Sequence, residues 1–261
     1  MDPLFSLNDK VVVVTGALGR LGRSYCAALR ERGAFVAAID RTVEDDSETM
    51  HHFAADVTCR AELECALTKI QAAWGRPIVG LVNNAGLDSP PNSPASENGP
   101  FEEYPEESWD RVMDVNVKGV FLSCQVFGGA MAQAGGGSIV NVSSIYGQVS
   151  PVQSLYEYRR KRGEEFFKPV AYAASKSALY NLTRYVATYW ARKNVRVNTL
   201  TLAGVFDNQD VEFLDGYCQR MPMGRMANAS DYTGPLVFLL SEASCYMTGA
   251  DLVVDGGWTA W

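Results

Sequence analysis

The sequence has no membrane-spanning run, few histidines and no cysteine motif, and each shortage excludes a class of protein. No apolar run approaches the roughly 18–20 residues that a membrane span needs, and the opening MDPLFSLNDK lacks the cationic start and apolar core of a signal peptide. The six cysteines form no metal-ligand spacing, so we expect reduced thiols that act as small core residues in a cytoplasmic protein. The two histidines, His51 and His52, are adjacent and would point to opposite faces of a strand, so we expect no metal site.

Positive charge is also scarce, with 23 Lys and Arg residues against 30 Asp and Glu residues and a net charge of −7. An acidic chain gains nothing from phosphate-rich polymers, so we expect no nucleic-acid partner. Hydrophobic residues are plentiful, at 47% of 261 residues. That amount can form one well-packed core, so we expect a single domain over residues 1–261. Because no apolar run is long enough to span a membrane, we expect no membrane partner.

Short apolar runs alternate along the chain with stretches of helical periodicity. The runs suit strands buried on both faces of a parallel sheet, and they cover residues 11–14, 34–39, 78–82, 139–142, 195–200 and 252–254. The expected helices cover 21–32, 61–74, 109–131 and 171–190. This alternation predicts an α/β fold, a doubly wound parallel sheet of Rossmann type in a three-layer α/β/α sandwich. Ligands bind beyond the carboxyl ends of such strands, where we expect a substrate loop over about 203–230.

A glycine-rich segment, TGALGRLG at residues 15–22, follows the first expected strand and begins the first expected helix. Gly16, Gly19 and Gly22 let the backbone turn tightly, approach a pyrophosphate and pack helix on strand. Asp40 ends the second expected strand, 18 residues beyond Gly22, where a carboxylate accepts hydrogen bonds from the adenosine ribose. The segment therefore predicts a dinucleotide site.

Asp40 also bears on the choice between NAD and NADP. A carboxylate at this place repels a 2′-phosphate, which favours NAD. Arg20 and Arg41 favour the opposite choice, because either could pair with that phosphate. We predict NAD as the preferred cofactor.

Tyr172 and Lys176 lie four residues apart on an expected helix and therefore share a face. A phenol with a pKa near ~10 is a poor base at neutral pH, and a neighbouring cation favours the phenolate. Ser144, at the end of an expected strand, could hydrogen-bond a substrate oxygen. This set predicts proton exchange with an alcohol or carbonyl.

Together these residues resemble the short-chain dehydrogenase/reductase superfamily in its single-domain form. The resemblance covers nearly the whole chain and includes NNAG at 83–86, DVNV at 114–117 and VDGG at 254–257. It implies that Tyr172 is the general acid/base and that Ser144 positions the substrate oxygen. Lys176 would hold the nicotinamide ribose and lower the pKa of Tyr172, and Asn116 would hold a water that relays protons.

The resemblance also implies a set of cofactor-binding residues and a homo-oligomer. The family is usually a dimer or tetramer, with the helices at 109–131 and 171–190 at interfaces, and we expect a homotetramer or dimer. The cofactor residues that the resemblance implies are Gly16, Gly19, Arg20, Leu21, Gly22, Asp40, Arg41, Asp56, Val57, Asn83, Ala85, Gly86, Tyr172, Lys176, Gly204, Val205 and Phe206.

The sequence departs from the family pattern at three places. The glycine spacing is GxxGxxG, with Arg20 at the usual middle glycine, and Ala203-Gly204 replaces the usual Pro-Gly after the sixth strand. Ser144 and Tyr172 are 28 residues apart, which implies an inserted segment at about 148–168. The longer Ser–Tyr segment, together with GVFDNQ at 204–209 and PMGRMA at 222–227, is similar to a subgroup associated with bacterial surface-sugar and nonulosonic-acid biosynthesis.

The insert must leave and rejoin the chain at the rim of the active site. We therefore expect Tyr146, Tyr156, Glu157 and Asn208 to contact the substrate. The cations at 159–162 allow two interpretations, a solvated loop or subunit contact and a clamp for an anionic substrate; the first is favoured because charge runs are usually solvated.

The function predicted from these residues is an NAD(P)-dependent oxidoreductase that transfers hydride between nicotinamide and a secondary alcohol or carbonyl. The candidate small-molecule substrates are a sugar, a sugar phosphate or a sugar acid. An alternative is a reductase or dehydrogenase of an apolar ketone or 3-oxoacyl substrate. From other classes, a non-catalytic dinucleotide sensor or scaffold and a sugar-nucleotide epimerase are weaker hypotheses, because the Asn116–Ser144–Tyr172–Lys176 set is complete and VDGG nearly ends the chain.

Overall fold

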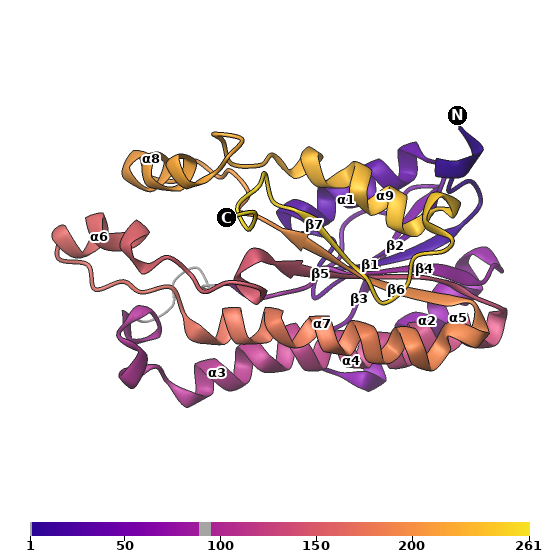
Figure 1. Cartoon of the computed structure of the whole chain (residues 1–261). Coiled ribbons are helices and arrows are strands. Elements are labelled where there is room, and N and C mark those ends of the chain that lie inside the picture. The colour runs from indigo at the N-terminus through magenta and orange to yellow at the C-terminus, as the bar shows by residue number, and fades with distance from the viewer. Residues whose placement is uncertain (1, 89–94) are drawn as a thin grey trace.

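Seven parallel strands form one sheet in the computed structural model, which describes residues 2–88 and 95–261 (Figure 1). The strand order is β3–β2–β1–β4–β5–β6–β7, so the chain winds outward in both directions from β1 and β4. The strands are β1 Val11–Thr15, β2 Phe35–Asp40, β3 Met50–Ala54, β4 Ile78–Asn83, β5 Gly137–Ser144, β6 Val195–Leu202 and β7 Asp251–Val254. The predicted doubly wound parallel sheet is confirmed.

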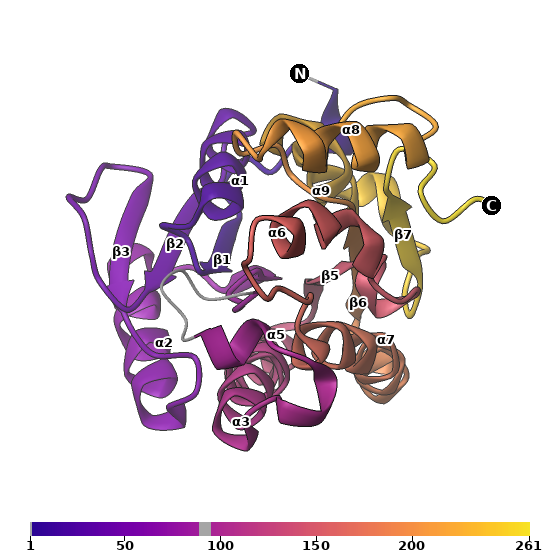
Figure 2. The ribbon, with the colours of Figure 1, turned by 90° about the vertical axis from the view of Figure 1, so that its left-hand side faces the viewer.

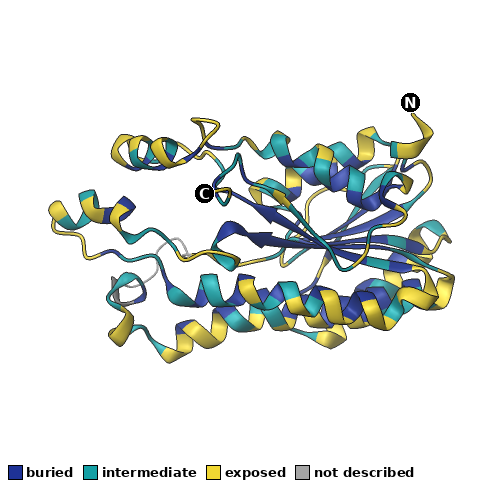
Figure 3. Cartoon of the chain, in the orientation of Figure 1, coloured by how far each residue is buried: buried dark blue, intermediate teal, exposed yellow. Residues whose placement is uncertain are grey.

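Helices cover both faces of the sheet, as Figures 1 and 3 show, and the strands between them are buried. Alternate residues of β1 divide between two cores: Val12 and Val14 pack with α1 and α9, whereas Val11 and Val13 face the other helices. The α-helices are α1 Arg20–Glu31, α2 Arg60–Trp74, α3 Glu106–Met113, α4 Gly119–Ser123, α5 Gly129–Ala134, α6 Glu157–Lys161, α7 Val170–Trp190, α8 Val211–Arg220 and α9 Thr233–Leu240. No helix within the described ranges is long and apolar enough to cross a membrane.

The helix expected at 109–131 is present but irregular. It runs from Glu106 to Ala134, and two π-helical segments, Asp114–Lys118 and Cys124–Gly128, separate α3, α4 and α5. Each π segment contains or borders a glycine pressed against another element; a Cβ on Gly128 would lie 2.6 Å from Cζ3 of Trp190. π-Helical turns are rare and cluster at functional sites, and the first one contains Asn116.

Two segments extend past the carboxyl ends of the strands and pack on one another (Figure 2). The segment at 148–168 contains α6, and the expected loop at 203–230 is not a loop throughout, because it contains α8. Phe213 and Tyr217, one turn apart on α8, bury their rings with Tyr156 and Phe166 of the other segment. This third apolar cluster fixes both segments over the edge of the sheet.

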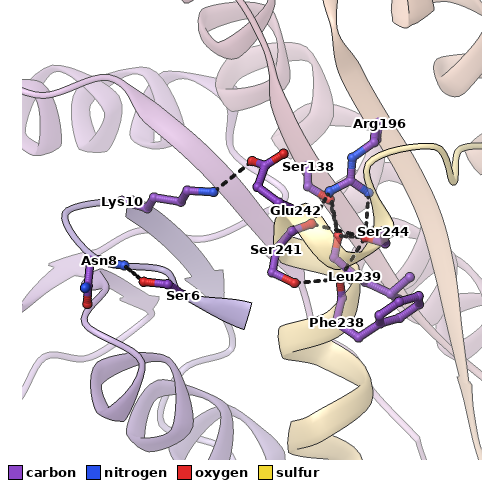
Figure 4. Close-up of polar contacts among 10 residues, drawn as sticks. All are labelled: Ser6, Asn8, Lys10, Ser138, Arg196, Phe238, Leu239, Ser241, Glu242 and Ser244. Carbon is purple, nitrogen blue, oxygen red and sulfur yellow. Dashed lines mark hydrogen bonds and ion pairs between the residues drawn. The ribbon is translucent and has the colours of Figure 1, made fainter. Parts of the chain in front are cut away.

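The opposite edge of the sheet is held by a partly buried polar network (Figure 4). The guanidinium of Arg196, at the start of β6, donates to Ser244 Oγ at 2.9 Å and to the carbonyls of Leu239 at 3.0 Å and Ser241 at 3.1 Å. Ser138 of β5 donates to the same Leu239 carbonyl at 2.7 Å. Burial lowers the pKa of Arg196. The amino ends of β5 and β6 are thus tied to the end of α9.

The cysteines differ in part from the expectation. Cys26 and Cys124 are buried, and burial raises the pKa of each to about 12. Cys65 and Cys245 are exposed, so the expectation that the cysteines are core residues is wrong for them. The reason is that Cys65 lies on the outer face of α2 and Cys245 in the turn after α9.

Candidate active site

Two adjoining cavities lie at the carboxyl edge of the sheet. One, of about 900 Å³, is lined by the ends of β5 and β6, the 148–168 segment and α8; the other, of about 1080 Å³, is lined by the glycine-rich segment and the ends of β2 and β4. Arg20, Leu21, Asn84, Gly86 and Val205 line both. We call the first the substrate cavity and the second the dinucleotide cavity.

Ser144 and Tyr172 meet in the substrate cavity. Ser144 ends β5 and Tyr172 lies in the first turn of α7, and both line this cavity. The Ser144 hydroxyl is near enough to the Tyr172 phenol to lower its pKa. Lys176 follows one turn later; its Nζ donates to the carbonyl of Val142 at 2.9 Å and lies 5.8 Å from the centre of the Tyr172 ring. The spacing that predicted these three residues therefore brings them together.

The pKa of Tyr172 is raised, not lowered, in the chain alone. Burial is the largest cause, the carboxylate of Asp88 adds to it, and the nearby Ser144 hydroxyl opposes it. Burial also lowers the pKa of Lys176 to about 8. Burial therefore dominates the pKa of Tyr172 in the chain alone. The lowering of that pKa by Lys176 together with a bound nicotinamide stays a prediction.

Asn116 holds the backbone that follows β4. Its Oδ1 accepts from the N–H of Leu87 at 2.7 Å, and its Nδ2 donates to the Leu87 carbonyl at 2.8 Å and to Ser175 Oγ at 2.9 Å. The side chain is completely buried. A Cβ on Gly86 would lie 3.3 Å from Asn116 Oδ1 and 3.5 Å from Lys176 Nζ, so Asn116 and Lys176 border the same small space.

The glycine-rich segment packs closely against the end of β4. Gly16 has a φ of +63°, and a Cβ there would lie 2.7 Å from Ala85 Cα; a Cβ on Gly22 would lie 2.1 Å from the Gly16 carbonyl oxygen. Asn84 Nδ2 donates to the carbonyls of Thr15 at 3.1 Å and Gly16 at 3.0 Å. Backbone therefore lines this part of the dinucleotide cavity.

The prediction for Asn83 is wrong in its geometry. Asn83 is buried away from both cavities, and its Nδ2 donates to Asn141 Oδ1 at 2.8 Å. The last residue of a central strand points into the layer beneath, so the next residue, Asn84, reaches the cleft instead.

Two carboxylates mark the far end of the dinucleotide cavity. Asp40 accepts from the N–H of Leu18 at 2.9 Å and from that of Arg41 at 2.8 Å. Asp56 accepts from the N–H of Thr58 at 2.8 Å and from its hydroxyl at 2.7 Å, and these bonds lower the pKa of Asp56. Arg41 and Val57 line the cavity beside them.

Arg20 connects the glycine-rich segment to the chain after β6. Its guanidinium donates to the Phe206 carbonyl at 3.0 Å and pairs with Asp207. Gly204 N–H donates to the Tyr217 hydroxyl at 2.7 Å, and Val205 lines both cavities. The Phe206 ring is a correction, because it lines neither cavity and is exposed; only its backbone contacts Arg20.

Three of the four expected substrate residues line the substrate cavity. Tyr146 and Tyr156 both do so, and burial raises the pKa of Tyr146 to about 12. Asn208 lines it from a left-handed conformation with a φ of 51°. Glu157 does not, and its carboxylate lies 3.7 Å from Lys161 Nζ on the exposed side of α6. Glu157 is the first residue of α6, and its carboxylate points to the exposed side because it pairs with Lys161 one turn later.

The cations at 159–162 have structural partners. Arg159 pairs with Glu164 at 2.8 Å, and Arg162 pairs with Glu212 of α8 at 2.6 Å. Arg160 donates to the Phe166 carbonyl at 2.8 Å. Arg159 and Arg162 do line the substrate cavity, but their charges are matched by carboxylates. The cations at 159–162 therefore form contacts within the 148–168 segment and an ion pair between that segment and α8.

Sequence reasoning missed a further ion pair in the substrate cavity, Asp88 with Lys168. The Lys168 side chain is 9% exposed, and its Nζ lies 5.2 Å from the centre of the Tyr172 ring. The two residues are 80 positions apart in different loops, so no local pattern indicates the pair.

Comparison with known proteins places this geometry among dehydrogenases. A family model described as Enoyl-(Acyl carrier protein) reductase matches residues 16–259. D-threitol dehydrogenase of Mycolicibacterium smegmatis is 33% identical over 98% of this chain and 95% of its own, and the NAD-dependent glycerol dehydrogenase of Listeria innocua is 30% identical over 99% and 97%. The crystal structure of a gluconate 5-dehydrogenase from Burkholderia cenocepacia, in complex with NADP and tartrate, superposes with a TM-score of 0.86 at 26% identity, covering 99% of this chain and 98% of that one.

Proposed function

The chain belongs to the short-chain dehydrogenase/reductase superfamily, and on that premise we propose that it is a polyol dehydrogenase that uses NAD. It is an NAD(P)-dependent oxidoreductase acting on secondary alcohols and carbonyls. The observation that carries the narrower proposal is the meeting of Ser144, Tyr172 and Lys176 in a cavity lined largely by charged and hydroxyl-bearing side chains. Relatives named as D-threitol and glycerol dehydrogenases support the same substrate class.

The dinucleotide cavity fits the cofactor that this family uses. Gly16 supports this, because any side chain there would strike Ala85, and the exposed backbone of this segment leaves N–H groups at the start of α1 for a pyrophosphate. Asp40 would hold the adenosine ribose, Asp56 and Val57 the adenine, and Val205 the nicotinamide end. When bound, the dinucleotide accepts or returns the hydride.

The side chains of the protein handle the proton and the orientation. Ser144 donates to the substrate oxygen, and Tyr172 takes the alcohol proton during oxidation or returns it during reduction. Lys176 supplies positive charge next to Tyr172, and with a pKa of about 8 it is mostly protonated at neutral pH. Asn116 holds Leu87 and so fixes the wall beside Lys176.

NAD is proposed over NADP because Asp40 occupies the place of a 2′-phosphate. Its carboxylate is held in position by the N–H groups of Leu18 and Arg41. Arg20, a candidate phosphate ligand, is already paired with Asp207. A solved relative binds NADP, so membership of the family does not by itself select NAD. The Asp40 carboxylate is therefore the feature that favours NAD for this chain.

Oligomerisation and a cytoplasmic location form part of the proposal. Tyr185 and Tyr189 of α7 are each 67% exposed, with ring centres 6.2 Å apart, and Phe121 of α4 is also exposed. Covering these aromatic rings with a second copy would bury apolar surface. The free cysteines suit a reducing compartment. Light scattering tests the assembly, and a monomer would contradict it.

A second candidate substrate class is an apolar ketone, because Tyr156, Phe213 and Met226 also line the substrate cavity. Initial rates with NAD separate the two classes. We expect kcat/KM for D-threitol and glycerol to be at least about tenfold above that for apolar secondary alcohols, since one lost hydrogen bond to a charged group has that effect. We also expect kcat/KM with NAD to be at least about tenfold above that with NADP. Higher kcat/KM values for apolar alcohols would favour the second candidate.

A further inference from the structure

The ion pair of Asp88 and Lys168 lies across the substrate cavity, next to the reacting groups. Asp88 comes from the loop after β4, and Lys168 comes from the end of the 148–168 segment, two residues before α7. Lys168 Nζ is 5.2 Å from the centre of the Tyr172 ring, and Lys176 Nζ is 5.8 Å from the same centre. Any substrate oxygen hydrogen-bonded to Tyr172 therefore has the pair as a neighbour.

The position of Lys168 is fixed by its backbone. Gln153 binds both polar groups of that residue: its Oε1 accepts from the Lys168 N–H at 2.9 Å, and its Nε2 donates to the Lys168 carbonyl at 3.1 Å. The neighbouring Phe167 N–H donates to the Asn98 carbonyl at 2.7 Å. An ammonium that starts from a fixed backbone loses less freedom when a ligand binds, which is the requirement for a recognition residue.

The arginines of the substrate cavity are each paired with a carboxylate. Arg20 pairs with Asp207, Arg159 with Glu164, and Arg162 with Asp210 and Glu212. Among the described residues that line this cavity, the cation not paired with a carboxylate is Lys176, whose ammonium donates to a backbone carbonyl. At the three arginines and at Lys168, a substrate carboxylate or phosphate would compete with a protein carboxylate for the cation, and that exchange gains little.

A neutral hydroxyl fits the Asp88–Lys168 pair without displacing either partner. An ammonium has three N–H donors and a carboxylate has about four acceptor positions, so one mutual contact leaves capacity on both. The Asp88 side chain is 53% exposed and can accept from a bound molecule. A hydroxyl donates and accepts at once, which matches a carboxylate beside an ammonium.

We propose that Asp88 and Lys168 together bind a hydroxyl next to the one that is oxidised, so that the enzyme selects neutral polyols over sugar acids and sugar phosphates. This inference rests on the proposed function, because it names the two side chains that bind a second hydroxyl of the polyol in that same site. It removes the sugar phosphate and the sugar acid from the list of candidate substrates.

Two alcohols that differ by one hydroxyl test the proposal directly, 2,3-butanediol and 2-butanol. Lys168→Met and Asp88→Asn are expected to lower the ratio of their kcat/KM values, diol over mono-alcohol, by about tenfold to a hundredfold, the effect of a lost hydrogen bond to a charged group. Lys161→Met and Glu157→Gln are the matched controls, since they remove the same two kinds of charge from an ion pair of the 148–168 segment that lies outside the cavity. Their ratios should stay within about twofold of the wild type.

The two variants should also act in opposite directions on an anionic substrate. Asp88→Asn frees the ammonium and should raise kcat/KM for gluconate, whereas Lys168→Met leaves a carboxylate facing the substrate and should lower it. Unchanged diol ratios in both variants, or gluconate rates that move together, would overturn the proposal. Melting temperatures and NADH binding show that each variant is folded.

Failure of the proposed function has a different signature. In that case the wild-type enzyme oxidises neither D-threitol nor 2,3-butanediol and turns over an apolar ketone, and both inferences fall. If the wild-type enzyme oxidises the polyols and the variants keep the wild-type diol ratio, the proposed function stands and the role of the pair is wrong.

Discussion

Tyr172 is the residue at which competing electrostatic effects matter most. Burial and Asp88 raise its pKa, whereas Ser144 lowers it. Alcohol oxidation needs the phenolate, so stabilisation must come from positive charge beside it: the ammonium of Lys176 and an oxidised nicotinamide bound in the adjoining cavity. The residues of the chain therefore form a site that is incomplete as a base until the cofactor binds.

Replacing Asp40 by alanine should weaken the discrimination between NAD and NADP. The change removes an acceptor for the ribose and the charge that repels a 2′-phosphate, so the kcat/KM ratio of NAD to NADP is expected to fall about tenfold to a hundredfold. Asp45→Ala is the control, an exposed carboxylate in the loop that follows β2, which lines neither cavity. A ratio that Asp40→Ala leaves at the wild-type value would show that another group selects the cofactor.

Individual site residues were predictable from sequence where spacing carries the information. Ser144, Tyr172 and Lys176 meet because a strand end and one helical turn fix their places. Asn83 and Phe206 were misplaced because a motif does not say which of two adjacent side chains faces the cleft. The Asp88–Lys168 pair depends on where two irregular segments meet in space, and no periodicity encodes that.

Among the elements, the strands and most helices follow directly from the sequence, and the irregular elements do not. β-Branched runs and the i, i+4 patterns of α1, α2 and α7 identify buried strands and amphipathic helices. The π segments have no such signature, because their residues have ordinary helical propensity and the bulge is set by packing. α8 was missed because glycine and acidic residues surround its two buried rings.

Two adjacent glycines test the packing of the second π segment. A Cβ on Gly128 would meet Trp190 at 2.6 Å and Ile139 at 2.9 Å, so Gly128→Ala is expected to lower the free energy of unfolding by about 1–3 kcal/mol. A Cβ on Gly129 meets no atom within 4 Å, so Gly129→Ala should raise it by about 0.5–1 kcal/mol through helix propensity. Urea denaturation measures both, and equal effects of the same sign would contradict the packing.

For the whole molecule, buried phenols and thiols link stability to alkaline pH. Burial raises the pKa values of Tyr25, Tyr156, Tyr172, Tyr217 and Tyr232 above the ordinary 10.0, and it raises those of the two buried cysteines above 9.0. A group whose folded pKa is raised contributes stability below its unfolded pKa and loses it as the pH rises. Lys176 acts in the opposite direction: burial lowers its pKa from 10.5 to about 8, so between these two pH values its contribution to stability rises with pH.

The free energy of unfolding should therefore fall above pH 9, steepening near pH 10 as the phenols of the unfolded chain ionise. Each group contributes about 1.4 kcal/mol per pH unit within its window. Denaturant titrations between pH 7 and 11 measure the curve. A free energy of unfolding that stays constant across that range would show that these groups ionise as readily in the folded protein as in the unfolded chain.

The central claim is that Tyr172 exchanges the proton of an NAD-linked polyol oxidation. Its most direct test is the turnover of D-threitol by the Tyr172→Phe variant, which lacks only the phenol hydroxyl. The control is Tyr246→Phe, which removes the hydroxyl of a fully exposed tyrosine. Tyr172→Phe should lower kcat by about 10²–10⁴-fold while NADH binding and the melting temperature stay close to wild type, and Tyr246→Phe should keep full activity. A Tyr172→Phe enzyme with a kcat within about twofold of wild type would contradict the account.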